Sequence, residues 1–137
     1  MQIRKTETLP VRNAADVVGV RQAVRKWAVE LGFSLVEQTK VVTAASELGR
    51  NMIDYGGGGT MRLESLDDGI RRGLRLHFED KGPGIPDLNA ALRDGFTTGS
   101  GMGLGLGGAK RLSNEFDIKT APGEGTHITI TRWKGVS

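Results

Sequence analysis

Hydrophobic residues recur at helical spacing in two long stretches of the N-terminal half of the chain. The spacing predicts one helix over residues 16–31, ended by Gly32, and a second helix from Ser34 to about Tyr55. Glu37, three residues after Ser34, completes the capping box expected at the start of the second helix. The apolar stripes of the two helices are Val17, Val20, Val24, Trp27, Ala28 and Leu31, and then Val41, Ala45, Leu48 and Met52.

Apolar and polar positions alternate elsewhere in the chain, which is typical of strands. An edge strand is expected over residues 2–9, and an antiparallel hairpin turns at residues 67–69 (Asp-Asp-Gly). A second pair of strands turns at residues 121–125 and returns over residues 126–133. The apolar positions of these strands are Met61, Leu63, Leu74, Leu76, Phe78, Phe116, Ile118, Ile128 and Ile130.

Glycine-rich and proline-rich segments mark the remaining connections. The run of four glycines at 56–59 predicts a flexible turn, and residues 80–87 (DKGPGIPD) predict a loop. Two further helices are expected, over residues 88–94 and from about 103 to 113. The resulting order β-α-α-β-β-α-α-β-β predicts a single α+β domain over residues 1–137, a two-layer sandwich with helices on one face of a mixed, mostly antiparallel sheet.

The composition is that of an ordinary globular protein and narrows the function only a little. Of the 137 residues, 37% are hydrophobic and 26% charged, and 19 Lys and Arg against 16 Asp and Glu give a net charge of +3. The basic residues are scattered, so nucleic-acid binding is not expected. The absence of cysteine excludes disulfides and thiolate zinc sites. The N-terminus lacks the apolar core of a signal peptide, and no apolar run is long enough for a membrane span. We therefore expect a soluble, cytoplasmic protein.

Glu47 and Asn51 form the first candidate site, in the second predicted helix. A separation of four residues places them on one helix face, beside the apolar stripe. A glutamate can accept a proton, and the carbonyl oxygen of an asparagine side chain is a ligand that magnesium accepts. Two solvated polar residues would give the same pattern, so the pair alone leaves both interpretations open.

Asp80 opens the second candidate site, which runs to Ile85 (DKGPGI) at the end of an apolar strand. An ionised aspartate only accepts hydrogen bonds, so it could accept one from an exocyclic amine such as that of adenine. Gly82 and Gly84 would allow the backbone to approach a ring closely. A simple turn leaving a hairpin explains the same residues equally well.

Six glycines fall within residues 99–108 (GSGMGLGLGG), the third candidate site. A glycine-rich segment leading into a helix can cradle phosphates, because its N–H groups point outward and the helix dipole favours anions. A mobile linker is the alternative, although Met102, Leu104 and Leu106 alternate with the glycines. The sequence context excludes a dinucleotide fold and a Walker P-loop, and the motifs of eukaryotic-type protein kinases do not occur.

Taken in order, these motifs resemble a known ATP-binding fold. The chain has E-x-x-x-N on a helix, D-x-G-x-G after a strand, G-x-G-x-G-L-G-L, and G-x-G-T at 123–126. This order resembles the Bergerat, or GHKL, fold shared by gyrase, Hsp90, histidine kinases and MutL, over about residues 40–130. The resemblance implies a nucleotide between the sheet and the helices, under a lid at about residues 86–102.

The resemblance also implies a role for each matching residue. Asn51 would coordinate Mg²⁺, and Glu47 would orient the attacking hydroxyl and accept its proton. A glutamate carboxylate is far less basic than a serine alkoxide, so the proton would be taken late. Asp80 would bind the adenine amino group, supported by Thr126. The ATP-binding set is completed by Gly82 and Gly84 beneath the adenine, and by Gly99, Gly101, Gly103, Leu104 and Gly105 at the lid and the phosphates.

Two residues depart from the pattern of that fold. Gly49 stands between Glu47 and Asn51 where a helix former is expected, which predicts a locally soft helix. Lys81 stands where asparagine is frequent. Neither departure removes a residue assigned to ATP. The lid residues 95–102 are expected to be displaced or poorly ordered without nucleotide.

The segment ALRDGFTTGSGMGLGLGGAKRLSNEF is similar to RsbT-type serine/threonine kinases of bacterial stressosome modules, more than to the anti-sigma kinases of the RsbW type. That resemblance implies a kinase that uses ATP and Mg²⁺ to phosphorylate a serine or threonine of a STAS-domain protein. Its further partner would be a PP2C-type phosphatase or a sigma factor. The alternative is a nucleotide-gated binding module, an anti-sigma factor or phosphatase activator with little phosphotransfer activity.

Overall fold

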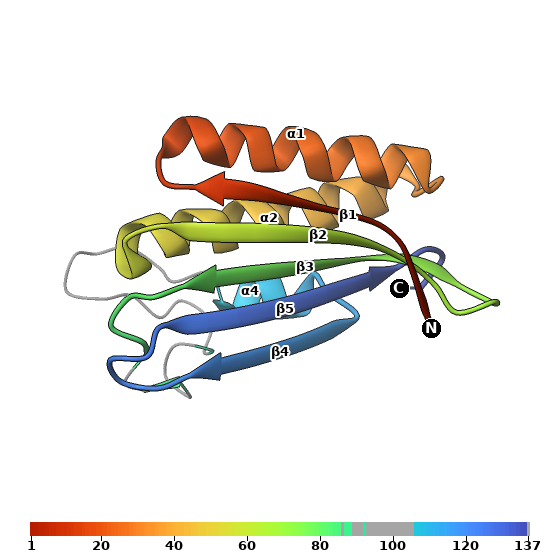
Figure 1. Ribbon diagram of the computed structural model, residues 1–137. Helices are drawn as coiled ribbons and strands as arrows, with labels where there is room; N and C mark the ends of the chain where they lie inside the picture. Colours follow the sequence, from red (N-terminus) through yellow and green to blue (C-terminus); the bar gives the residue numbers. More distant parts are fainter. Residues whose placement is uncertain (86, 89–91, 93–105, 137) are drawn as a thin grey trace.

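Helices cover one face of a five-stranded sheet in the computed structural model, which describes residues 1–85, 87–88, 92 and 106–136 (Figure 1). The strands are β1 (Gln2–Val11), β2 (Gly59–Asp67), β3 (Arg72–Asp80), β4 (Glu115–Thr120) and β5 (Thr126–Trp133). The helices are α1 (Ala14–Glu30), α2 (Leu35–Gly56) and α4 (Leu106–Arg111). The expected α+β architecture is confirmed.

The strands lie in the order β1-β2-β3-β5-β4. All four pairings are antiparallel, so the sheet is more uniform than the mixed sheet expected. The chain leaves β3, passes through α4 to the far edge at β4, and returns between them as β5. This return places the last residue of β3 beside the first residue of β5, so that Asp80 pairs with Thr126.

The helix boundaries follow from their caps. Ser34 accepts a hydrogen bond from the backbone N–H of Glu37, and Glu37 accepts one from the N–H of Ser34, so the predicted capping box is confirmed. The first helix begins at Ala14, two residues before the expected position, because Asn13 caps it by accepting from Asp16. The helix expected over 103–113 is described only as α4, and of the helix expected over 88–94 only one turn, a bond from Leu92 to Leu88, is described.

The core lies between the helices and the sheet, as the apolar stripes predict. Helix α2 packs against α1, α4 and β3. Every predicted stripe residue of α1 and α2 is buried except Leu31, which is half-buried and packs against the same cluster. The strands contribute Met61, Leu63, Leu74, Leu76, Phe78, Ile128 and Ile130 to this core. Helix α2 is continuous through Gly49, which is buried against the side chains of Val17 and Val11.

The four glycines at 56–59 form a constrained junction rather than the flexible turn expected. Gly57 caps α2 in the left-handed conformation with φ of 74°, and its neighbour Gly58 has φ of 93°. Gly59 already belongs to β2, where a Cβ would collide with the carbonyl oxygen of Glu79. The run of glycines therefore joins a helix end directly to a strand start.

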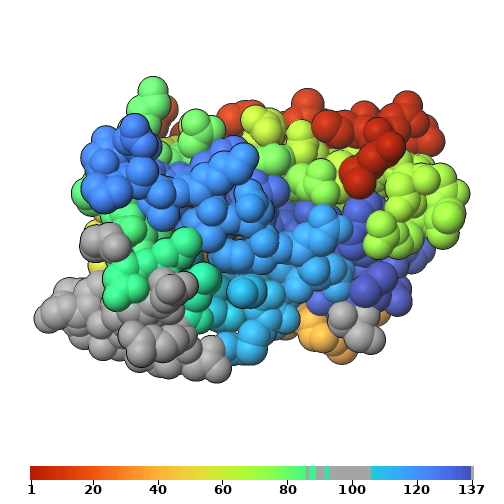
Figure 2. Space-filling model, turned by 90° about the horizontal axis from the view of Figure 1, so that it is seen from below, coloured from red at the N-terminus to blue at the C-terminus, as the bar shows by residue number. Residues whose placement is uncertain are grey.

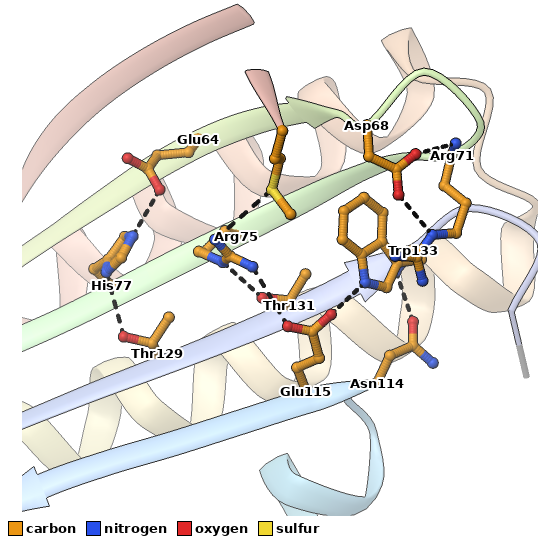
Figure 3. Close-up of polar contacts among 11 residues, drawn as sticks. Glu64, Asp68, Arg71, Arg75, His77, Asn114, Glu115, Thr129, Thr131 and Trp133 are labelled. Carbon is orange, nitrogen blue, oxygen red and sulfur yellow. Dashed lines mark hydrogen bonds and ion pairs between the residues drawn. The ribbon is translucent and has the colours of Figure 1, made fainter. Parts of the chain in front are cut away.

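The face of the sheet opposite the helices carries a network of polar side chains (Figure 3). Arg75 donates to Thr131 at 2.9 Å and pairs with Glu115 at 3.4 Å. Trp133, which is 1% exposed, donates its indole N–H to Glu115 and lies beneath the guanidinium of Arg71. At the Trp133 end, the side chains of Arg71 and Glu115 therefore cover this face of the sheet.

The segment that follows β3 lies against the turn between β4 and β5 (Figure 2). The N–H of Gly123 in that turn donates to the carbonyl of Pro83 at 2.9 Å.

Among the residues that the structure describes, no helix is both long enough and apolar enough to cross a membrane.

Candidate functional site

A pocket opens between α2, the sheet and the segment after β3. Its lining is mostly apolar, with a few polar groups that converge from different elements, as in ligand-binding sites generally. Four residues predicted from the sequence lie at this pocket: Asn51 of α2, Asp80 of β3, Gly84 after β3 and Thr126 of β5. The rest of the lining is Leu48, Met52, Tyr55, Gly56, Phe78, Ile85, Leu106 and Ile128.

Asp80 ends β3 at one side of the pocket, half-buried. Its carboxylate accepts hydrogen bonds from the backbone N–H of Gly82, at 2.9 Å, and of Thr126. Burial raises the pKa of the Asp80 carboxyl, and the two backbone hydrogen bonds oppose the rise without cancelling it. A carboxylate held in this way inside an apolar pocket is a strong acceptor for a ligand that offers an N–H donor.

The backbone packs closely around Asp80. A Cβ on Gly56, the last residue of α2, would collide with the Asp80 carboxylate. Gly84 has φ of 79°, and a Cβ there would collide with the carbonyl oxygen of Ala121. A Cβ on Gly82 would collide with the backbone of Gly56, so Gly82 and Gly84 are both required by contacts within the protein itself, whatever they also provide to a ligand. The need for glycine at position 56 is not visible in the sequence, because its partner is distant in the chain.

Thr120, at the end of β4, joins the parts of this site and has no motif that marks it in the sequence. Its hydroxyl accepts from the N–H of Ile85 at 2.9 Å and lies 3.0 Å from the hydroxyl of Thr126. It also donates to the carbonyl of Gly125 at 3.1 Å. One side chain thus fixes the loop after β3 to the start of β5, on both sides of Asp80.

Asn51 and Glu47 lie one turn apart on α2, as predicted, but in different surroundings. Asn51 is half-buried in the pocket lining, and its Nδ2 is buried without a hydrogen-bond partner. Only one other buried side-chain atom among the described residues, Nε of Arg132, also lacks a partner. Glu47 is exposed and does not belong to the described lining. An unpaired buried amide costs about 1–3 kcal/mol, so a ligand that pairs with Asn51 would recover that cost.

The predicted phosphate end of the site lies outside the described residues. This applies to Gly99, Gly101, Gly103, Leu104 and Gly105, and to the expected lid at about 86–102 apart from residues 87, 88 and 92. The expected displacement of residues 95–102 without nucleotide therefore stays a prediction. Leu106, at the first described position after them, is buried and lines the pocket at the start of α4. Lys81, beside Asp80, is exposed.

Comparison with known proteins places this arrangement among nucleotide-binding domains. The sequence pattern described as "Histidine kinase-, DNA gyrase B-, and HSP90-like ATPase" matches residues 36–134. The chain is 46% identical to the serine/threonine-protein kinase RsbT of Bacillus subtilis over 118 residues, which cover 86% of this chain and 89% of that protein. It is 31% identical to an anti-sigma F factor of Bacillus licheniformis, over 82% of this chain and 80% of that protein.

Two solved structures share the fold at low sequence identity. The RsbU and RsbW domains of a Mycobacterium tuberculosis protein match with a TM-score of 0.67 and 21% identity, over 97% of this chain and 34% of that one. The SiaB–SiaC complex from Pseudomonas aeruginosa matches with a TM-score of 0.58 and 14% identity, over 96% of this chain and 90% of that one. The present chain corresponds to about a third of the length of the first of these.

Proposed function

We propose a substrate class and a mechanism for this chain, which belongs to the histidine kinase-, DNA gyrase B- and HSP90-like ATPase family. Within that family it is a serine/threonine-protein kinase of a partner-switching system, as its similarity to RsbT and to anti-sigma factors indicates. The proposed reaction transfers the γ-phosphoryl group of ATP to a serine or threonine hydroxyl of a STAS-domain protein. The observation that carries the proposal is the convergence of Asn51, Asp80 and Thr126 on one pocket.

The adenine of ATP is proposed to bind at the Asp80 end of the pocket. The carboxylate of Asp80 would accept a hydrogen bond from the adenine amino group, and it would repel the carbonyl oxygen that guanine carries at the same position. Thr126 supports this end through its backbone bond to Asp80. The ring would lie between apolar side chains, with Gly82 and Gly84 allowing close approach. The predicted glycines at 99–105 would then lie along the phosphates.

Magnesium fits the donor set that this end of α2 offers. Among the described residues no group of three or more His, Asp or Glu side chains could hold a metal ion. Mg²⁺ bound with nucleotides usually needs only one or two protein oxygens, because phosphates and water supply the rest. The buried amide of Asn51 is otherwise unpaired on its nitrogen, so it could hold the ion through its oxygen and a phosphate through its nitrogen. Bound there, the ion would neutralise negative charge on the phosphates.

Glu47 is proposed to act on the substrate hydroxyl rather than on ATP. Its exposed position, one helical turn from Asn51, leaves it accessible to a serine or threonine presented by a partner. Phosphoryl transfer depends mainly on positioning and charge neutralisation. The carboxylate of Glu47 would therefore only have to align the hydroxyl and accept its proton as the new bond forms.

Phosphate transfer to a STAS-domain protein tests this function directly. The chain is incubated with Mg²⁺, ATP labelled in its γ-phosphate and purified STAS-domain proteins, beginning with those encoded beside its own gene. We expect label on one STAS protein, and no label when the acceptor serine or threonine is replaced with alanine. Nucleotide-dependent co-elution of the two proteins without label would contradict the kinase proposal and support the alternative of a nucleotide-gated binding module.

Replacement of Thr120 with valine is expected to raise the KM for ATP severalfold with little change in kcat. Valine keeps the shape of the side chain but leaves the Ile85 N–H unpaired and releases the loop after β3 from β5. An unpaired N–H of this kind costs about 1–3 kcal/mol, so the melting temperature should fall as well. Steady-state kinetics and thermal unfolding measure both effects. Serine, which restores the hydroxyl, should restore KM, and a Thr120→Ser variant as impaired as Thr120→Val would contradict the positioning role.

A further inference from the structure

The turn between β2 and β3 (residues 68–71) presents an isoleucine to solvent at one end of the molecule. Figure 1 shows this turn projecting beyond the sheet and the helices, at the opposite end from the segment that follows β3. Ile70 is 95% exposed, the highest value among the exposed large hydrophobic residues that the structure describes. Single apolar side chains are common at protein surfaces, so a role for Ile70 depends on how the turn holds and surrounds it.

Hydrogen bonds within the turn fix the backbone that carries Ile70. The carboxylate of Asp68 accepts from the N–H of Ile70, at 3.0 Å, and from the N–H of Arg71. The N–H of Asp68 donates to the carbonyl of Arg71 at 3.1 Å, and the N–H of Gly69 donates to the carboxylate of Asp67 at 2.8 Å. A loop that is ordered before it binds loses less conformational entropy on binding, so its contacts contribute more fully to affinity.

Three guanidinium groups flank this turn and face solvent. The ion pairs here are those of Arg4 and Arg72 with Asp67, and that of Arg71 with Asp68 (Figure 3). The side chains of the three arginines are 44–65% exposed, whereas those of the two aspartates are only 17–21% exposed. The surface around the turn is therefore positive although its charges nearly balance, and it is complementary to an acidic surface on a partner.

We propose that the β2–β3 turn is a docking site for the STAS-domain protein that accepts the phosphoryl group, with Ile70 inserted into an apolar pocket bordered by carboxylates on that protein. The inference rests on the proposed function, from which it takes the identity of the acceptor. The proposed transfer reaction uses only Glu47 to contact the acceptor. A specific protein complex buries about 800 Å² on each partner, so contacts away from Glu47 are required.

The acceptor is large enough to contact the turn and the active site together. Strand β3 runs from Arg72, beside the turn, to Asp80 at the pocket, and its nine residues span about 27 Å. Glu47 lies between these two ends, because it precedes the last residue of α2 by nine residues, or about 14 Å (Figure 1). A domain of about 100 residues has a radius of gyration of about 13 Å and is therefore about 30 Å across.

A second copy of the chain fits this turn less well than an acidic protein does. The hollow beside the turn is lined by Leu31 and Leu66, but also by Arg4 and Arg72, and its Asp67 is already paired with both arginines. Inserting the turn of one copy into this hollow would bring the arginines of both copies together. Like charges oppose that contact, whereas carboxylates on a different protein would favour it.

Calorimetric titration with a purified STAS-domain protein encoded beside the chain's own gene tests this docking site. The chain is held with Mg²⁺ and a non-hydrolysable ATP analogue, so binding is measured without transfer. We expect Ile70→Ser to weaken binding about 10- to 100-fold, the usual contribution of one fully buried isoleucine side chain. The melting temperature and the affinity for the ATP analogue should match the parent, because the side chain is exposed and distant from the pocket.

Two further variants separate the apolar contact from the charges. Ile70→Val keeps a β-branched apolar side chain and should retain most of the affinity for the STAS-domain protein. Binding by the parent should weaken as NaCl is added, and Arg72→Gln should reduce that dependence because it removes one exposed cation from the turn.

The matched control is Leu35→Ser, which removes a large apolar side chain that is 71% exposed at the start of α2 and should bind like the parent. Equal affinity in the parent and Ile70→Ser would overturn the proposal, and so would an equal loss in Leu35→Ser. Dimerisation of the parent that Ile70→Ser abolishes would assign the turn to a second copy instead. A parent that binds the STAS-domain protein through Ile70 but transfers no label contradicts the kinase proposal alone, and a parent that binds none contradicts both.

Discussion

Replacement of Asp80 with asparagine is expected to weaken ATP binding about 100-fold while leaving the melting temperature at pH 7 unchanged or higher. The loss of affinity follows from the proposed bond to the adenine amino group. A hydrogen bond to a charged group contributes about 1.5–3 kcal/mol, and each 1.4 kcal/mol changes affinity about tenfold. The side-chain NH₂ of asparagine is a hydrogen-bond donor, and so is the adenine amino group. Where the two groups face each other no hydrogen bond can form, which adds to the loss of ATP affinity.

The same substitution weakens ATP binding but should not lower the stability of the fold, because burial raises the pKa of Asp80 in the folded chain. A raised pKa means that the folded state favours the protonated carboxyl, so its stabilising contribution is complete below the unfolded pKa and is lost as the pH rises through the folded pKa. At pH 7 the ionised carboxylate therefore costs stability, and a neutral asparagine avoids that cost. The proposed bond to the adenine amino group needs the ionised carboxylate, so ATP affinity should fall as the pH drops through the raised pKa of Asp80.

Calorimetric titration with ATP and thermal unfolding at several pH values measure both effects. Asp68→Asn is a suitable control, because Asp68 accepts backbone bonds from Arg71 and Ile70 in the β2–β3 turn and these lower its pKa to about 2. That variant should lose melting temperature at neutral pH, progressively less in acid, with unchanged ATP affinity. If Asp80→Asn lowers the melting temperature and leaves ATP affinity intact, Asp80 is a structural residue and the adenine assignment is wrong.

The local patterns of the sequence were sufficient to predict the elements and most of the core. Alternation and helical spacing depend on neighbours a few residues apart, and they predicted both long helices, the capping box at Ser34 and the hairpin of β2 and β3. Asn51, Asp80 and Thr126 could be predicted as site residues because each belongs to a recognisable motif. Their meeting could be predicted only through the resemblance to an ATP-binding fold, since no local pattern places β5 beside β3.

The features that the sequence did not predict depend on contacts between distant segments. Thr120 is one of several threonines on strands, and only the folded chain shows that its hydroxyl reaches both Ile85 and Thr126. The sequence predicts Gly56 as part of a flexible turn, whereas in the folded chain its packing against the Asp80 carboxylate requires a glycine there. The contact between His77 and His127 could not be predicted either, because two residues 50 apart in sequence come within 3.4 Å only when β5 returns beside β3.

Replacement of Glu47 with alanine is expected to lower the rate of phosphate transfer to a STAS-domain protein by about 10²- to 10⁴-fold, the usual contribution of a general base. ATP affinity should stay within a factor of about two, because Glu47 is exposed and stands outside the described pocket lining. Stability should change little for the same reason, since surface substitutions are usually within about 0.5 kcal/mol. Single-turnover transfer and calorimetric ATP binding separate the two effects.

Two further variants distinguish the role of Glu47 from a general effect of charge on α2. Glu47→Gln keeps the length of the side chain and can still accept a hydrogen bond from the substrate hydroxyl, but it cannot take the proton. If it transfers as slowly as Glu47→Ala, proton acceptance is what the reaction needs, and if it transfers faster, alignment supplies part of the rate. Asp54→Ala removes another exposed carboxylate two turns further along α2 and should transfer at the parent rate. Parent-like transfer by Glu47→Ala would instead move the base to another residue, because proton transfer to Glu47 could then contribute nothing to the barrier.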